Sequence, residues 1–160
     1  YRMKHGLDVR YINPFVQAST HVMESVAQMK LTLGRPAISL LNFEDNTFLL
    51  QVGVVGEMKG QVIIAMSVET AKQIASIMMC GMPVEELDEM PRSALSELSN
   101  MIMGNAATAF SMQEILIDIT TPMSMLGSHL SLQTEIEALK VPLLKDGEET
   151  IGLYICVSKD

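Results

Sequence analysis

The chain has 160 residues, of which 48% are hydrophobic and 19% charged, which indicates one ordinary globular domain with a substantial core. Its 11 lysine and arginine residues stand against 19 aspartate and glutamate residues, a formal charge of −8 that disfavours nucleic acid as a partner. No apolar run reaches the ~18 residues that span a bilayer, and the first residues lack the apolar segment of a signal peptide. We therefore expect a single domain over residues 1–160 without a membrane partner.

The cysteine pattern favours a reducing compartment. Cys80 and Cys156 lie far apart and form no CxxC pair, and a chain of this length does not need a disulfide framework. A cytoplasmic location is therefore expected. We interpret Tyr1 and Arg2, which precede Met3, as residues left by cloning and assign them no role.

The first part of the chain changes from a helical to an extended pattern. Apolar residues at helical spacing predict a helix over residues 14–30, with Pro14 in its first turn and Asn13 placed to cap it. Three segments rich in Val, Ile and Leu follow and are predicted to be strands: residues 37–41, 47–55 and 60–67. A glycine-bounded turn separates the last two, which predicts a hairpin.

Helical spacing resumes at residues 70–80 and stops at Gly81 and Pro83, as expected for a helix end. A third helix is predicted from Pro91 to about Met112. Three strand-like segments follow, separated by Pro122, Gly127 and the turn Lys145-Asp-Gly147: residues 115–120, 129–144 and 150–157. Three helices and about six strands, grouped in meanders, indicate an α+β layered domain.

The third helix concentrates small and polar residues on one face. At ~100° per residue, a narrow outward stripe contains Ser93, Glu97, Asn100 and Gly104. The opposite side is apolar and would anchor the helix to the core: Leu95, Leu98, Ile102, Ala106 and Ala109. Such a stripe can approach another protein closely and direct one carboxylate and one carboxamide into its cleft.

An ordinary solvent-facing helix surface is the simpler interpretation of this stripe, and the spacing alone favours it. Gly104 argues the other way. An exposed glycine inside a helix costs up to ~1 kcal/mol relative to alanine, so close approach of a partner becomes a reason for its presence.

A family resemblance adds to this evidence. Ser93-x-x-x-Glu97-x-x-Asn100, followed by Met-Ile-Met-Gly-Asn-Ala-Ala, resembles the active-site helix of the CheC, CheX and FliY phosphatases, and Pro122 matches the proline of their next strand. The resemblance implies a CheC-like domain with an antiparallel-rich sheet. CheC and FliY carry two copies of the helix motif. Here the first helix has Glu24 but Ala27 in place of asparagine, which resembles the single-site CheX subgroup.

The resemblance also implies a mechanism, in which the chain accelerates hydrolysis of the aspartyl phosphate of a CheY-like response regulator. Asn100 would orient the attacking water, because a carboxamide both donates and accepts hydrogen bonds, and Glu97 would pair with the regulator's lysine. Ser93, Met101 and Gly104 would contact the partner. Mg2+ would belong to the regulator, so the chain needs no cofactor. A homodimer joined through sheet edges is also implied, and the aliphatic C-terminal strands would suit it.

Two other functions remain open. One is a non-catalytic interaction domain of the same fold, as in flagellar switch proteins, although intact Glu97 and Asn100 favour catalysis. The other is a metal-dependent enzyme built on an acidic cluster of four residues: Glu85, Glu86, Asp88 and Glu89. That cluster has no ligand spacing, and the three histidines are dispersed at positions 5, 21 and 129, so we expect no metal site.

Overall fold

The computed structural model describes residues 9–159, and the expectations for Tyr1, Arg2 and His5 fall outside that range. Its helical segments are a short 3-10 helix over Val9–Tyr11, then α1 (Asn13–Ala27), α2 (Val68–Met78) and α3 (Glu89–Ser111). Its strands are β1 (Thr32–Leu33), β2 (Ala37–Ser39), β3 (Leu41–Phe43), β4 (Thr47–Gly56), β5 (Met58–Ser67), β6 (Ile117–Ile119), β7 (Met123–Gly127), β8 (Leu130–Leu132), β9 (Ala138–Lys145) and β10 (Glu148–Lys159).

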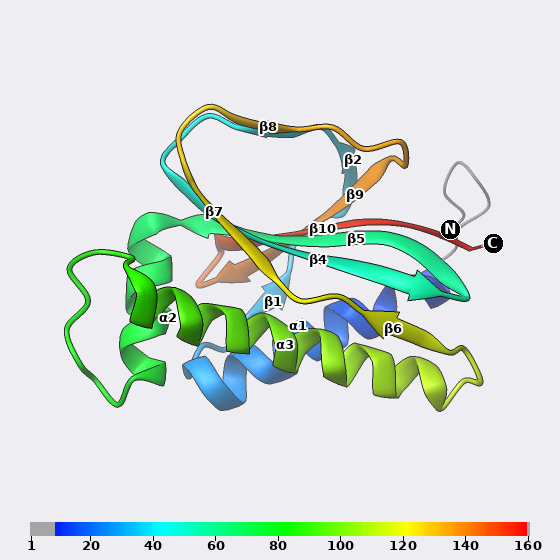
Figure 1. The fold of residues 1–160 in the computed structure, drawn as a ribbon, viewed down its shortest axis with the longest axis horizontal. Coiled ribbons are helices and arrows are strands. Elements are labelled where there is room, and N and C mark those ends of the chain that lie inside the picture. The colour runs from blue at the N-terminus through cyan, green and yellow to red at the C-terminus, as the bar shows by residue number, and fades with distance from the viewer. Residues whose placement is uncertain (1–8, 160) are drawn as a thin grey trace.

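Eight strands form an antiparallel sheet in the order β1-β9-β10-β5-β4-β6, with β2 also paired to β9 and β7 also paired to β4. The three helices lie together on one face of this sheet (Figure 1). On the opposite face β3 and β8 form a two-stranded ribbon that arches over the sheet (Figure 1). The α+β class and the antiparallel sheet are therefore confirmed.

Alternating side chains divide the core between the two faces. Along β4, Phe48 and Leu50 are fully buried against the helices, whereas Leu49 is buried against the ribbon. This is the two-residue period of a strand that is covered on both sides. The ribbon cluster is small and includes an edge-to-face contact between Phe43 and Tyr154, whose ring centroids lie 5.2 Å apart.

The hairpin of β4 and β5 confirms the prediction from residues 47–67 and pairs Thr47 with Ser67 at its open end. Ser67 also begins α2, because its hydroxyl accepts a hydrogen bond from the Thr70 amide at 3.0 Å. Such an N-cap satisfies an amide that the helix leaves unpaired. The helix ends before Gly81, as predicted.

The first helix is shorter than predicted at its C-terminal end. It ends at Ala27, because Gln28 adopts a left-handed conformation with φ of 55°. The Met29 amide then donates to the Met23 carbonyl at 3.1 Å, which closes the helix end. The predicted Asn13 cap is wrong: Ile12 occupies that position without a side-chain cap, and its carbonyl accepts from the Phe15 amide.

The strand count was underestimated. β1 and β7 were missed, and the predicted strand 37–41 covers β2 and only the first residue of β3. The predicted strand 129–144 is two strands, β8 and β9, which belong to different sheets. Polar residues 133–135 interrupt that run. β7 reads Met-Ser-Met-Leu-Gly and has no β-branched residue, so its pairing with β4 rather than strand propensity maintains it.

Candidate active-site groove on helix α3

Helix α3 begins close to the predicted position. Asp88 is its N-cap residue, and the Asp88 carbonyl accepts from the Arg92 amide at 3.1 Å. Pro91 lies buried in the first turn, where its missing N–H leaves no helical hydrogen bond unmade. The start is two residues earlier than predicted, and the end at Ser111 agrees with the predicted end near Met112.

The inner face of α3 is largely as predicted. Leu95, Leu98, Ile102 and Ala106 are buried, while Ala109 is only half-buried. The buried face is wider than the predicted stripe, because it also includes Met103, Phe110 and Ser99. The buried Ser99 hydroxyl donates to the Ser96 carbonyl at 2.7 Å, which satisfies its hydrogen-bonding requirement without a partner outside the helix. This broad anchor fixes the orientation of the outer face.

The outer face brings the predicted catalytic residues together. Ser93, Glu97 and Asn100 are all exposed, and Gly104 is half-exposed one turn later. Met101 lies beside them but is half-buried and packs against the core. The structure thus places five predicted site residues on or beside one stripe, with Met101 partly withdrawn from solvent.

Gly104 has no packing requirement within the described residues. A Cβ atom placed there would meet no heavy atom within 4 Å apart from the helix's own nearby backbone. An alanine would therefore fit, and it would gain up to ~1 kcal/mol of helix stability. The packing of the described residues therefore does not account for the glycine.

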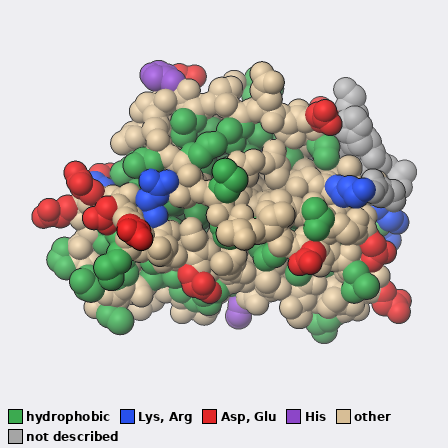
Figure 2. Space-filling view, viewed as in Figure 1, with side chains coloured by type: hydrophobic (Ala, Val, Ile, Leu, Met, Phe, Trp, Pro, Cys, Tyr) green, Lys and Arg blue, Asp and Glu red, His purple; other side chains and the backbone are tan. Residues whose placement is uncertain are grey.

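An open groove of about 590 Å³ runs along this face of α3. Seven residues line it: Asp88, Glu89, Arg92, Ser93, Ser96, Glu97 and Asn100. Three carboxylates and one guanidinium give it a net negative character, which favours a cationic partner group. Figure 2 shows acidic side chains gathered beyond its N-terminal end, over the connection between α2 and α3.

Arg92 is a site residue that the sequence analysis missed. Its Nε and Nη2 atoms donate to the Ser124 hydroxyl at 3.1 and 2.9 Å, and Nη2 also donates to the Ser124 carbonyl at 3.3 Å. The guanidinium therefore joins the groove to β7, 32 residues further along the chain. No local sequence pattern marks such a pair, because β7 itself was not predicted.

Pro122 lies between β6 and β7, not inside a strand as expected from the resemblance. It is half-buried and directly precedes Met123, the first residue of β7. Proline cannot donate a hydrogen bond to a neighbouring strand, which explains the break at this point. It stands two residues before Ser124, so Arg92 holds the segment that carries it.

Helix α1 presents no second copy of the arrangement. Glu24 is exposed there, but Ala27, three residues later, is fully buried and ends the helix. The prediction from sequence that α1 lacks the Glu–Asn pair is consistent with this geometry.

The four acidic residues of the cluster are not gathered into a set of ligands. Glu85, Glu86, Asp88 and Glu89 are exposed, and within residues 9–159 no group of three or more His, Cys, Asp or Glu side chains could hold an ion. The exposed His129 instead contacts Glu44 at 2.9 Å.

Across residues 9–159, no helix is both long and apolar enough to cross a membrane.

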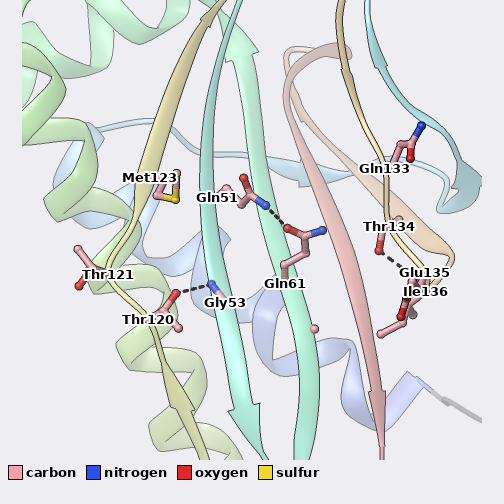
Figure 3. Close-up of a pocket in the computed structure, with 11 residues that line it drawn as sticks. Gln51, Gly53, Gln61, Thr120, Thr121, Met123, Gln133, Thr134, Glu135 and Ile136 are labelled. Carbon is pink, nitrogen blue, oxygen red and sulfur yellow. Dashed lines mark hydrogen bonds between the residues drawn. The ribbon is translucent and has the colours of Figure 1, made fainter.

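A second hollow of about 460 Å³ lies on the ribbon face of the sheet (Figure 3). Gln51 and Gln61, from neighbouring strands, form a hydrogen bond on its floor, and Thr120 and Thr121 stand at its side. It offers mostly neutral hydrogen-bonding groups. The α3 groove therefore remains the better candidate for catalysis.

Comparison with known proteins gives a consistent result. The sequence profile of the family Chemotaxis phosphatase CheX matches residues 48–144, more than half of the chain, including all of α3. The CheY-P phosphatase CheX of Thermotoga maritima is 28% identical over 151 residues, which cover 94% of this chain and 97% of that protein.

Solved structures share the fold over nearly the whole chain. The CheX–CheY–BeF3–Mg2+ complex from Borrelia burgdorferi matches with a TM-score of 0.79 and 26% identity, covering 95% of this chain and 100% of that one. A CheC-like superfamily protein from Shewanella matches with a TM-score of 0.80 and 25% identity, covering 95% and 99%.

Proposed function

The chain belongs to the CheX family of chemotaxis phosphatases, and from this premise we propose that it hydrolyses the aspartyl phosphate of a CheY-like receiver domain with Asn100 and Glu97. The observation that supports these roles is the exposure of both side chains on one stripe of a rigidly anchored helix. A helix that presents them together can enter the partner's active site without rearranging its own core.

Asn100 orients the attacking water. Phosphoryl transfer depends on positioning and charge stabilisation more than on covalent chemistry, so a side chain that holds water in line with the breaking bond is sufficient. The carboxamide accepts from the water through its oxygen and donates through its nitrogen. It is not a strong base, so proton abstraction is not part of its role.

Glu97 docks the helix on the regulator. A carboxylate near a phosphoryl group is repelled unless a cation lies between them, and the lysine of a receiver active site supplies that cation. Mg2+ is bound by the receiver, as the Mg2+ content of the relative's complex with CheY suggests. This chain then contributes side chains alone, and the reaction takes place where the regulator is, in the cytoplasm.

The decisive experiment replaces Asn100 with alanine and follows the decay of a phosphorylated CheY-type receiver. Loss of a positioned group is expected to lower the accelerated rate by on the order of 100-fold. Asn105→Ala is the matched control, because Asn105 is an exposed asparagine on the same helix, five residues away. If Asn100→Ala accelerates dephosphorylation as well as the unaltered protein does, the mechanism is refuted. If the unaltered protein binds the receiver without accelerating its dephosphorylation, the chain is an interaction domain instead.

A homodimer is part of the proposal, but not through the C-terminal strand. β10 is paired with β9 over Glu148–Ile155 and with β5 over Gly152–Lys159, so its central residues have no free edge for a second copy. Among the described residues, the outer edge formed by β1 and β2 is free within the sheet and has exposed apolar side chains at Leu33 and Ile38, with the exposed Leu40 directly after β2. A second copy paired there would cover them.

The solution mass tests this edge. We expect a dimer at micromolar concentration by light scattering, and a monomer after Leu40→Lys, because a lysine would place a charge in the new interface. A dimer that persists after this change would place the interface elsewhere.

A further inference from the structure

Strands β6 and β7 form one interrupted edge strand beside β4, and the interruption is a bulge. β6 ends at the pair Val54 and Ile119, and β7 begins at the pair Gln51 and Met123. Between these pairs β4 has two residues, whereas the partner segment has three, residues 120–122. One residue is therefore inserted, and such bulges bend a strand, re-aim its side chains and are common beside active sites.

Two hydrogen bonds hold the bulge to the sheet, and Figure 3 draws the one between the Gly53 amide and the Thr120 hydroxyl. The Gly53 amide donates to the Thr120 hydroxyl at 2.8 Å, and the Thr120 amide donates to the Gly53 carbonyl at 3.0 Å. A Cβ atom at position 53 would lie 2.9 Å from Thr120 Oγ1, so the close approach requires glycine. One end of the bulge is thus fixed by a contact that leaves no room for a larger residue.

The Arg92–Ser124 bridge holds the other end from the helix side. Ser124 pairs with Leu50, whose side chain is buried in the cluster beneath the helices, so Ser124 faces the helices too. Three hydrogen bonds from Arg92 reach it, two to the hydroxyl and one to the carbonyl. The planar guanidinium makes this set of bonds, and a lysine ammonium at the same position would not reproduce it.

Pro122 lies close to the point that the bridge holds. Thr120, Thr121 and Met123 line the hollow on the ribbon face (Figure 3), whereas Pro122 does not. Pro122 stands two residues before Ser124, whose side chain faces the helices. The motif proline is therefore two residues away from the contact by which Arg92 holds this edge strand to α3.

We propose that the Arg92–Ser124 bridge is a positioning device that holds the Pro122 bulge and the catalytic stripe of α3 as one rigid surface. The Arg92 side chain lines the same groove as Glu97 and Asn100. Its guanidinium bonds to Ser124, two residues after the bulge. A docked receiver then contacts helix and bulge at a fixed separation, which keeps the water held by Asn100 in line. This inference rests on the proposed phosphatase function.

Two simpler roles make different predictions. If Arg92 only contacts the receiver, its removal weakens docking and Ser124 is irrelevant. If the bridge only stabilises the fold, its loss lowers the melting temperature and leaves the folded protein fully active. A positioning role instead lowers turnover, because misplacement of a catalytic group by about 1 Å costs up to 100-fold in rate.

The experiment compares Arg92→Lys, Ser124→Ala and the double variant with the unaltered protein. Phosphate release is measured at several concentrations of a CheY-type receiver phosphorylated with acetyl phosphate, to separate kcat from KM. We expect each single variant to lose about 5- to 10-fold in kcat, consistent with partial misplacement, with KM changed less than 2-fold. The double variant should be no worse than either single variant, because both remove the same contact.

Ser131→Ala is the control, since Ser131 is an exposed strand serine whose hydroxyl bonds to Asn42 on the ribbon. It should leave kcat unchanged. A normal kcat for Ser124→Ala, or a loss confined to KM, overturns the inference. If Asn100→Ala abolishes activity while Ser124→Ala does not affect it, only the bridge proposal fails. If Asn100→Ala is fully active, the phosphatase mechanism itself fails.

Discussion

Helices α1 and α3 lie on the same face of the sheet and contact each other, but only α3 presents the pair of polar groups expected of a catalyst. Phe15 of α1 and Phe110 of α3 meet edge to face, with ring centroids 5.1 Å apart. Each helix also exposes a glutamate. The difference lies three residues after that glutamate, where α3 continues for three more turns and α1 stops.

The contrast teaches that a glutamate on a helix surface does not by itself make a site. In α1 the residue three positions after Glu24 is Ala27, which is fully buried at the helix end. In α3 the equivalent position is Asn100, which is exposed in mid-helix. Helix length and the direction of one residue therefore separate α1 from the helix that we propose to be catalytic.

The largest effect is expected from Ala27→Asn, which would copy the α3 sequence pattern onto α1. The side chain would enter the core, and the burial of an amide together with overpacking should cost about 3 kcal/mol of unfolding free energy. Urea unfolding measures this loss. The change should also create no phosphatase activity. To test this, Ala27→Asn is combined with Asn100→Ala, so that any activity measured would come from α1.

A stable variant with restored phosphatase activity would contradict the comparison, because it would show that the sequence pattern is sufficient without the α3 geometry. Ala107→Asn on α3 is the matched control. Ala107 is only half-buried, so its replacement should cost much less.

The second-largest effect is expected at Glu97 of α3, with the exposed Glu24 of α1 as its control. Glu97→Gln removes the charge that we propose pairs with the receiver's lysine, and loss of a charge-assisted hydrogen bond should raise KM by about 10-fold. Glu24→Gln makes the same chemical change on α1 and should alter nothing. Steady-state phosphate release gives both values.

The dependence of KM on ionic strength gives a second comparison of the Glu97 and Glu24 variants. Salt screens an ion pair, so the KM of the unaltered protein and of Glu24→Gln should rise with salt, whereas that of Glu97→Gln should rise less. Equal salt dependence in all three proteins would remove Glu97 from the docking contact.

Much of α3 could be predicted from the sequence because its information is local. The 3.6-residue period places Leu95 inside and Glu97 outside, and helical spacing alone fixes both. The end of α1 could not be predicted in the same way. Met29 continues the apolar spacing, but it is buried after a left-handed turn at Gln28 and not within the helix.

Long-range contacts account for what the sequence did not predict. β7 was missed because its residues have low strand propensity. Without β7, neither the Arg92–Ser124 bridge nor the bulge that precedes β7 could be predicted. The position of Pro122 outside a strand follows from the register of β4 with two short strands. Such pairings depend on residues more than 30 positions apart, which periodicity does not report.

A smaller effect distinguishes stability from docking at Gly104. Gly104→Ala should raise the unfolding free energy by up to ~1 kcal/mol, since alanine is the better helix former and the position is open. The added methyl group should nevertheless raise KM for the receiver, because it would lie on the surface that we propose the partner approaches. Asn105→Ala should leave KM unchanged, and a Gly104→Ala protein with normal KM would remove this position from the docking surface.

The smallest effect is expected at the end of α1, where Gln28→Gly should stabilise the protein by about 0.5 kcal/mol. Gln28 holds φ of 55°, a conformation that glycine adopts without steric cost, although glycine's freer unfolded chain offsets part of the gain. Gln17→Gly, at an exposed position within α1, is the control and should instead destabilise by ~1 kcal/mol. Urea unfolding resolves the opposite signs. Because the proposed site lies on α3, both variants should dephosphorylate the receiver at the normal rate at 25 °C, and a changed kcat in Gln28→Gly would show that the end of α1 takes part in the site.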